Sequence, residues 1–209
     1  MNFRAYSPYT LKETYWLGTD SNQRYLDNLK NNYEKLRSNY WIDRTIKYTF
    51  NSHGFRCDEF TSDDSIMFLG CSHTLGVGLP IEDTWAYQVA KNLNLKNVNL
   101  GQGGSSSDTA YRLASYYIEQ LKPKIVVIRP PDPARFEMFD CYNKPTLHSP
   151  QYQESVTDYK DWFSCEHNHI LNEEKNLLAI EYLCTRFNTK FVRPPEIDGS
   201  LLVRDVARD

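Results

Sequence analysis

The chain has 209 residues, with 24 Lys and Arg against 27 Asp and Glu, for a formal net charge of −3. Its basic residues are dispersed along the chain, which argues against a nucleic-acid partner. No apolar run is long enough to span a bilayer, which argues against a membrane span. The 5 cysteines show no C-x-x-C spacing and the first residues lack the apolar stretch of a signal peptide, so we expect free thiols and a cytoplasmic protein.

The N-terminal part is interpreted as an extension of a single domain. Residues 1–20 are irregular and aromatic, and residues 21–38 place four apolar side chains at helical spacing on a polar background. These are Tyr25, Leu29, Tyr33 and Leu36. The spacing predicts an amphipathic helix, and we expect residues 1–45 to pack on a body that spans residues 46–209.

Strands and helices alternate along this body. Short apolar runs predict strands at 46–50, 66–69, 97–100, 124–129 and 189–192. Amphipathic spacing predicts helices at 84–95, 108–121 and 172–187. The residues expected to face inward are Trp85, Val89 and Leu93, then Tyr111, Ala114, Ile118 and Leu121, then Leu177, Ile180, Cys184 and Phe187. Residues 137–170 form a long insertion. The order predicts a three-layer α/β/α sandwich with a mainly parallel sheet of the last four strands.

A serine follows the first strand of this predicted sheet. The run Ile66 to Leu69 stops at a glycine, and Ser72 comes three residues later, among residues that allow a tight turn. Open α/β sheets bind ligands at the carboxyl ends of their strands. The pattern therefore presents the Ser72 side chain where a ligand would sit.

A glycine-rich loop follows the next strand. Residues 101–108 read GQGGSSSD, and such a glycine density indicates close backbone approach or positive φ. Backbone N–H groups that converge beyond two adjacent parallel strands would stabilise negative charge on a reacting group. A phosphate-binding loop is the weaker alternative, since the Lys of a P-loop and a full G-x-G-x-x-G pattern are absent.

These segments resemble the SGNH (GDSL-type) hydrolases. Gly70-Cys71-Ser72-His73-Thr74 is similar to their first block, Gly-Asp-Ser-x-Thr, with a cysteine in the place of Asp, and residues 99–104 are similar to the second block, Asn-x-Gly-x-Gly. The turn Asn51 to Arg56 resembles a lead-in found in some members. The resemblance implies an esterase acting on a small ester or an O-acylated sugar. It makes Ser72 the nucleophile and the N–H groups of Ser72 and of Gly103 or Gly104 the oxyanion donors, with no cofactor.

The third block departs from that family. Residues 129–137 read RPPDPARFE and contain no Asn, and prolines remove backbone donors. Arg135 is a candidate to bind an anionic group of the substrate, with a salt bridge to Asp132 or Glu137 as the alternative. Cys71 is a rival nucleophile, although a cysteine at a strand end is more often a small buried hydrophobe.

The last block of the family reads Asp-x-x-His. Asp209 falls on its Asp, so the His would lie three residues further on, and we expect either a truncated gene product or a degenerate member. A non-catalytic binding or structural module is therefore the alternative function. Residues 165–169 (CEHNH) are the one metal-like cluster, but the spacing fits no standard zinc module, and no metal is expected. The sequence leaves the oligomeric state open.

Overall fold

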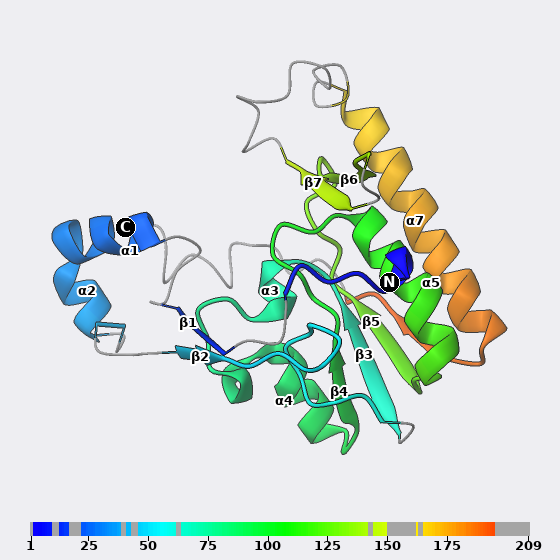
Figure 1. Ribbon diagram of the computed structural model, residues 1–209, viewed down its shortest axis with the longest axis horizontal. Coiled ribbons are helices and arrows are strands. Elements are labelled where there is room, and N and C mark those ends of the chain that lie inside the picture. The colour runs from blue at the N-terminus through cyan, green and yellow to red at the C-terminus, as the bar shows by residue number, and fades with distance from the viewer. Residues whose placement is uncertain are drawn as a thin grey trace.

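The central element is a parallel sheet. The structure, a computed structural model, describes residues 2–9, 13–16, 22–38, 41–42, 46–61, 64–141, 144–149, 162 and 165–194. Within them, a 4-stranded sheet has the order β4-β3-β5-β8, and all its pairs are parallel (Figure 1). Its strands are β3 (Ser65–Leu69), β4 (Lys96–Asn99), β5 (Ile125–Ile128) and β8 (Lys190–Val192). These are the four strands that the sequence predicts for the sheet.

Helices cover both faces of the sheet. In β3, Ile66 and Phe68 pack with α4 (Trp85–Asn92), which follows the short helix η2 (Ile81–Asp83). Met67 and Leu69 point the other way, into a core shared with α5 (Ser107–Leu121) and α7 (Glu166–Arg186). Successive side chains of a strand face opposite sides, so one fully buried strand joins two cores. The predicted three-layer α/β/α sandwich is confirmed.

Two of the predicted inward residues are exposed. Tyr111 in α5 is 40% exposed and Leu93, just after α4, is 51% exposed. The buried face of α5 is centred one residue earlier than the sequence pattern indicates. Its core residues are Ala110, Leu113, Ala114, Tyr117 and Ile118.

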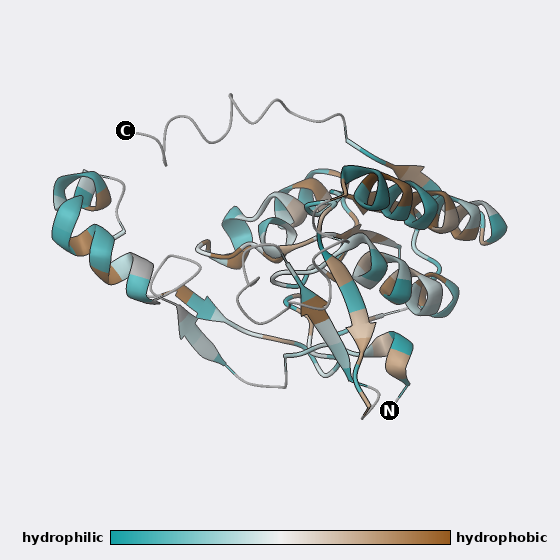
Figure 2. Cartoon of the chain, turned by 90° about the horizontal axis from the view of Figure 1, so that it is seen from above, coloured by the Kyte–Doolittle hydropathy of each residue, from teal (hydrophilic) through white to brown (hydrophobic). Residues whose placement is uncertain are grey.

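The N-terminal part contains helices and a separate strand pair. The predicted helix at 21–38 is two helices, α1 (Asn22–Asn31) and α2 (Tyr33–Ser38). Both are largely hydrophilic and lie at one side of the molecule, apart from the sheet (Figures 1 and 2). Strand β1 (Thr14–Trp16) pairs antiparallel with β2 (Ile46–Tyr48), and the short helix η1 (Phe3–Ala5) contacts α5. A domain boundary at residue 45 stays a prediction.

The insertion carries elements of its own. Strands β6 (Phe136–Phe139) and β7 (Pro145–His148) form an antiparallel hairpin. Helix α7 begins at Glu166, earlier than the predicted residue 172. Its first turns bury the polar residues His169, Asn172 and Asn176, so they lack the apolar pattern that marks a helix in the sequence. No described helix combines the length and the apolarity that crossing a membrane requires.

Candidate active site

Ser72 lies directly beyond the carboxyl end of β3. Gly70 ends the strand with a φ of 152°, and a Cβ there would lie 2.3 Å from the Thr74 hydroxyl oxygen and 2.8 Å from the Arg129 carbonyl oxygen. Cys71 is then extended, and the one-turn helix α3 (Ser72–Leu75) follows, capped at its carboxyl end by Gly76 with a φ of 77°. The two glycines therefore turn the chain sharply enough to set the serine at the sheet edge.

Ser72 and Cys71 differ in access. The Cys71 side chain is buried, at 6% exposure, whereas Ser72 is half-buried. Neither the hydroxyl nor the backbone N–H of Ser72 has a hydrogen-bond partner among the described residues. The serine thus offers both a hydroxyl and a backbone donor to a ligand.

Asn99 joins the end of β4 to the serine turn. Its side-chain amide donates to the Thr74 carbonyl oxygen over 2.7 Å, and its side-chain oxygen accepts from the Gly101 N–H over 2.9 Å. A Cβ on Gly101 would lie 2.6 Å from the backbone nitrogen of Leu75. The loop after β4 and the helix α3 are therefore packed backbone against backbone.

The glycine loop lies beside the serine turn. The Gln102 N–H donates to the Gly70 carbonyl oxygen over 3.1 Å, and the Ser105 hydroxyl donates to the same oxygen over 2.9 Å. The Gly103 N–H donates to the Tyr9 hydroxyl over 3.0 Å. The Gly104 N–H has no acceptor within the described residues, and Gly104 has a φ of 73°. Of the two glycines predicted as oxyanion donors, Gly104 is the one whose N–H is free of other described groups.

The lead-in segment, Asn51 to Arg56, contacts the serine turn through Arg56. Arg56, 1% exposed, donates to the carbonyl oxygens of Leu75, Gly76 and Leu79 over 3.2, 2.6 and 2.6 Å. Its guanidinium lies 3.8 Å from the Tyr48 ring centroid. Burial lowers the pKa of Arg56. The sequence contained the Phe-Arg signal, but nothing local indicated that this arginine holds the end of α3.

Asn51 shapes that lead-in. Its side-chain oxygen accepts from the N–H groups of His53 and Phe55, each over 3.0 Å, and its amide donates to the Asp58 carbonyl oxygen over 3.1 Å. Gly54 completes the turn with a φ of 80°. This lead-in turn directs Phe55 into the core, at 0% exposure. The next residue, Arg56, is thereby placed against the serine turn.

Arg135 lies in the segment that follows β5. Glu137 pairs with Arg112, and the Asp132 side chain accepts from the Ala134 N–H. Among the described residues no salt bridge joins Arg135 to either carboxylate, so that alternative is wrong. The Arg135 Nε is buried and has no hydrogen-bond partner within the described part of the chain. Arg135 stays a candidate substrate-binding residue.

The 5 histidines of the sequence all lie in the described ranges, and none hydrogen-bonds Ser72. His169 bonds the Trp162 carbonyl oxygen at 2.8 Å, and His53 stacks on Phe60. His148 stacks on Phe136, and partial burial lowers the pKa of its imidazole.

Two further predicted features concern the end of the chain and the metal-like cluster. Asp209 lies outside the described residues. The described residues contain no group of His, Cys, Asp and Glu that could hold a metal ion. Residues 166–169 are helical, so the alternate residues of this cluster do not share the extended face that the sequence reading assumes.

No family model matches the sequence, and no curated protein matches it. Among solved structures, the esterase EstA from Pseudoalteromonas sp., inhibited by monoethylphosphonate, is similar at 17% identity and a TM-score of 0.40, over 64% of this chain and 63% of EstA. AlinE4, an SGNH-hydrolase family esterase, is similar at 11% identity and a TM-score of 0.33, over 69% of this chain and 82% of AlinE4. The chain thus spans less than two thirds of the length of EstA.

Proposed function

We propose that this protein is a serine hydrolase of the SGNH type that cleaves a small ester or an O-acylated carbohydrate, with Ser72 as nucleophile. One observation carries the proposal. Ser72 follows the carboxyl end of a central strand, its hydroxyl and N–H are free of other described groups, and the glycine loop is bonded to the same turn. This is where an open parallel sheet offers a ligand site.

In the proposed reaction, the Ser72 Oγ attacks the acyl carbon and its proton passes to a base, while negative charge develops on the carbonyl oxygen. The backbone N–H groups of Ser72 and Gly104 would receive that charge. Gly103 is the less direct candidate because its N–H already donates to Tyr9. Asp209 would orient the base, as the resemblance implies, and Arg135 would bind an anionic group of the substrate.

A binding module without turnover is the second candidate. It is favoured because none of the five histidines, all of them described, hydrogen-bonds Ser72. A serine hydroxyl is a weak nucleophile unless a base takes its proton. In this reading, the same serine turn and glycine loop would hold an acylated sugar or a partner without cleaving it.

A fluorophosphonate probe separates the two functions. Under the proposed function the purified protein is labelled, labelling is lost in Ser72→Ala, and it is retained in Cys71→Ala. Loss in Cys71→Ala with retention in Ser72→Ala would make the thiol the nucleophile. Absence of labelling in the parent protein would favour the binding module. A screen of simple acyl esters against O-acetylated sugars would then identify the substrate class.

A further inference from the structure

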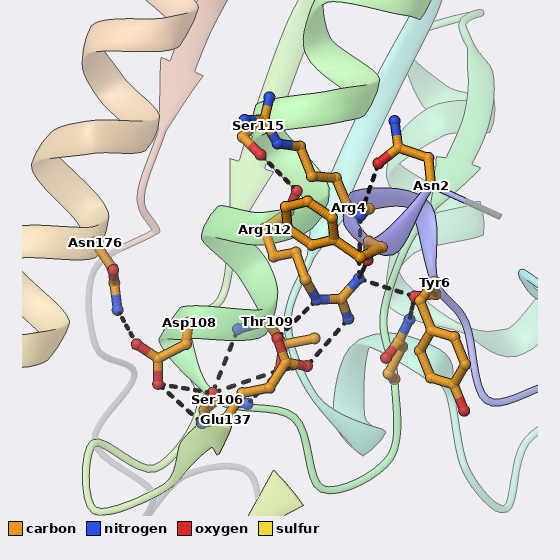
Figure 3. A network of polar contacts seen from close by, with 12 residues as sticks. Asn2, Arg4, Tyr6, Ser106, Asp108, Thr109, Arg112, Ser115, Glu137 and Asn176 are labelled. Atoms are coloured by element: carbon orange, nitrogen blue, oxygen red, sulfur yellow. Dashed lines mark hydrogen bonds and ion pairs between the residues drawn. The ribbon is translucent and has the colours of Figure 1, made fainter. Parts of the chain in front are cut away.

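The first residues of the chain are fixed to the body by one arginine. Residues 2–9, the N-terminal strap, run from α5 toward α3 (Figure 1). The Arg112 guanidinium donates to the carbonyl oxygens of Phe3, Arg4 and Tyr6 over 3.3, 3.1 and 3.0 Å (Figure 3). The same side chain pairs with Glu137 over 2.7 Å, and both are at most 5% exposed. Three carbonyl contacts from a buried charge hold the strap in one place.

The far end of the strap has further contacts. The Gln102 amide donates to the Tyr6 carbonyl oxygen over 3.3 Å, and the Ser7 hydroxyl donates to the Gly54 carbonyl oxygen over 2.6 Å. The Tyr9 ring stacks on Phe50 at 4.6 Å between centroids and 15° between planes. The strap therefore bonds both the glycine loop and the lead-in turn of the candidate site.

The Tyr9 hydroxyl is seated at that site. Its oxygen accepts from the Gly103 N–H, and its own proton has no acceptor among the described residues. The ring packs against the cluster that contains Leu75, three residues after Ser72. Gln102, next to Gly103, bonds the Gly70 carbonyl oxygen. The hydroxyl is thus bonded to the glycine loop one residue before Gly104, and its ring packs on the cluster that includes the last residue of α3.

The chemistry of this hydroxyl suits a donor. Burial raises the pKa of Tyr9, so the phenol keeps its proton at neutral pH. The N–H of Gly103 bonds the oxygen and leaves the proton as the group that a ligand can meet. The segment after β5 holds Pro130, Pro131 and Pro133, which have no N–H to offer.

We propose that the Tyr9 hydroxyl is a side-chain oxyanion donor, which hydrogen-bonds the negative oxygen formed when Ser72 attacks an ester. The inference rests on the proposed function of Ser72. The alternative is that the Tyr9 side chain is a plug, which blocks the site and must leave Gly103 before substrate binds. The contacts of the strap with Arg112, Gln102 and Gly54 disfavour it, because each would resist such a movement.

The variant Tyr9→Phe removes the hydroxyl and keeps the stacked ring. The donor role predicts a fall in kcat of about 100-fold on an activated ester, with KM changed less than about twofold. Tyr6→Phe is the matched control, since it lies in the same strap and its hydroxyl has no partner among the described groups. It should retain the parent rate. Thermal unfolding of both variants shows whether they are folded.

Each outcome of this comparison has one meaning. Equal or faster turnover in Tyr9→Phe overturns the donor role, and faster turnover identifies Tyr9 as a plug. A rise in KM without a fall in kcat also overturns it, because such a change means that the hydroxyl binds substrate and transition state equally. If the parent protein neither reacts with the fluorophosphonate nor turns over ester, the proposed function fails and the donor role fails with it. A labelled parent with an unaffected Tyr9→Phe overturns the donor role alone.

Discussion

The side-chain amide of Asn99 donates to the carbonyl oxygen of Thr74 over 2.7 Å, so the last residue of β4 directly holds the one-turn helix that begins at Ser72. Asn99 is 1% exposed, and its side-chain oxygen simultaneously accepts from Gly101. One buried amide therefore satisfies a carbonyl of the serine turn and an N–H of the glycine loop. The two loops of the candidate site therefore share this buried amide as a support.

Asn99→Ala should therefore destabilise the protein by about 2–3 kcal/mol, because it leaves two buried backbone groups without partners. Urea denaturation measures the change. Asn97→Ala is the matched control, since Asn97 lies in the same strand and its side-chain oxygen has no partner among the described residues. We expect it to change stability by less than about 1 kcal/mol. Equal effects of the two substitutions would contradict a special role for Asn99.

Gly101→Ala should also disturb the site, by a steric route. The added Cβ would lie 2.6 Å from the Leu75 nitrogen and 2.9 Å from the Thr74 carbonyl carbon, and backbone atoms cannot rotate away. We expect a destabilisation of about 1–3 kcal/mol and slower fluorophosphonate labelling of Ser72. Labelling and stability at the parent level would show that the glycine loop and α3 are not in close backbone contact.

Local patterns explain why the sheet could be predicted and parts of the site could not. Apolar runs such as Ile66 to Leu69 indicate buried strands without any knowledge of neighbours. Tyr9 meets Gly103 from 94 positions away, and no local pattern encodes such a contact. The start of α7 was missed because its inner face is polar, where Asn172 and Asn176 donate to Asp108. Sequence patterns therefore predict the strands but not the polar contacts between residues far apart in the chain.

The buried ion pair of Arg112 and Glu137 predicts a large stability effect. Removing one partner leaves a charge uncompensated at a site that is at most 5% exposed, so Glu137→Gln should cost about 3–5 kcal/mol. The exposed pair of Lys124 and Asp64, with side chains 56% and 67% exposed, is the matched control. Asp64→Asn should cost less than about 1 kcal/mol. Chemical denaturation compares them, and similar losses would contradict the contrast in burial.

Thiol reactivity should follow burial. Burial raises the pKa of Cys57 and of Cys184 to about 12 in each case, and both side chains are buried. At pH 8 these thiols are therefore protonated and inaccessible. Brief alkylation of the native protein with iodoacetamide should modify the exposed Cys141 and spare Cys57 and Cys184, as peptide mass spectrometry would show. Modification of Cys57 at the rate of Cys141 would argue against this core.

Arg56 provides the sharpest test of how the serine turn is held. Its planar guanidinium reaches three carbonyl oxygens after Ser72 and lies over Tyr48. A lysine ammonium is a single point of charge and cannot reproduce this fork. Arg56→Lys should therefore destabilise the protein by about 2–3 kcal/mol and slow the labelling of Ser72, although the charge is conserved.

The control for this prediction is Arg186→Lys. Arg186 is exposed on α7 and lies over a neighbouring aromatic ring, Phe187, at 5.5 Å, so the same change should alter stability by less than about 0.5 kcal/mol and leave labelling unchanged. Urea denaturation and the labelling rate at fixed probe concentration are measured together. If Arg56→Lys loses stability but labels Ser72 at the parent rate, Arg56 supports the core and not the turn. If Arg56→Lys loses neither stability nor labelling, the guanidinium does not hold the end of α3, and the turn is fixed by its glycines, by Asn99 and by the bonds of the glycine loop to Gly70.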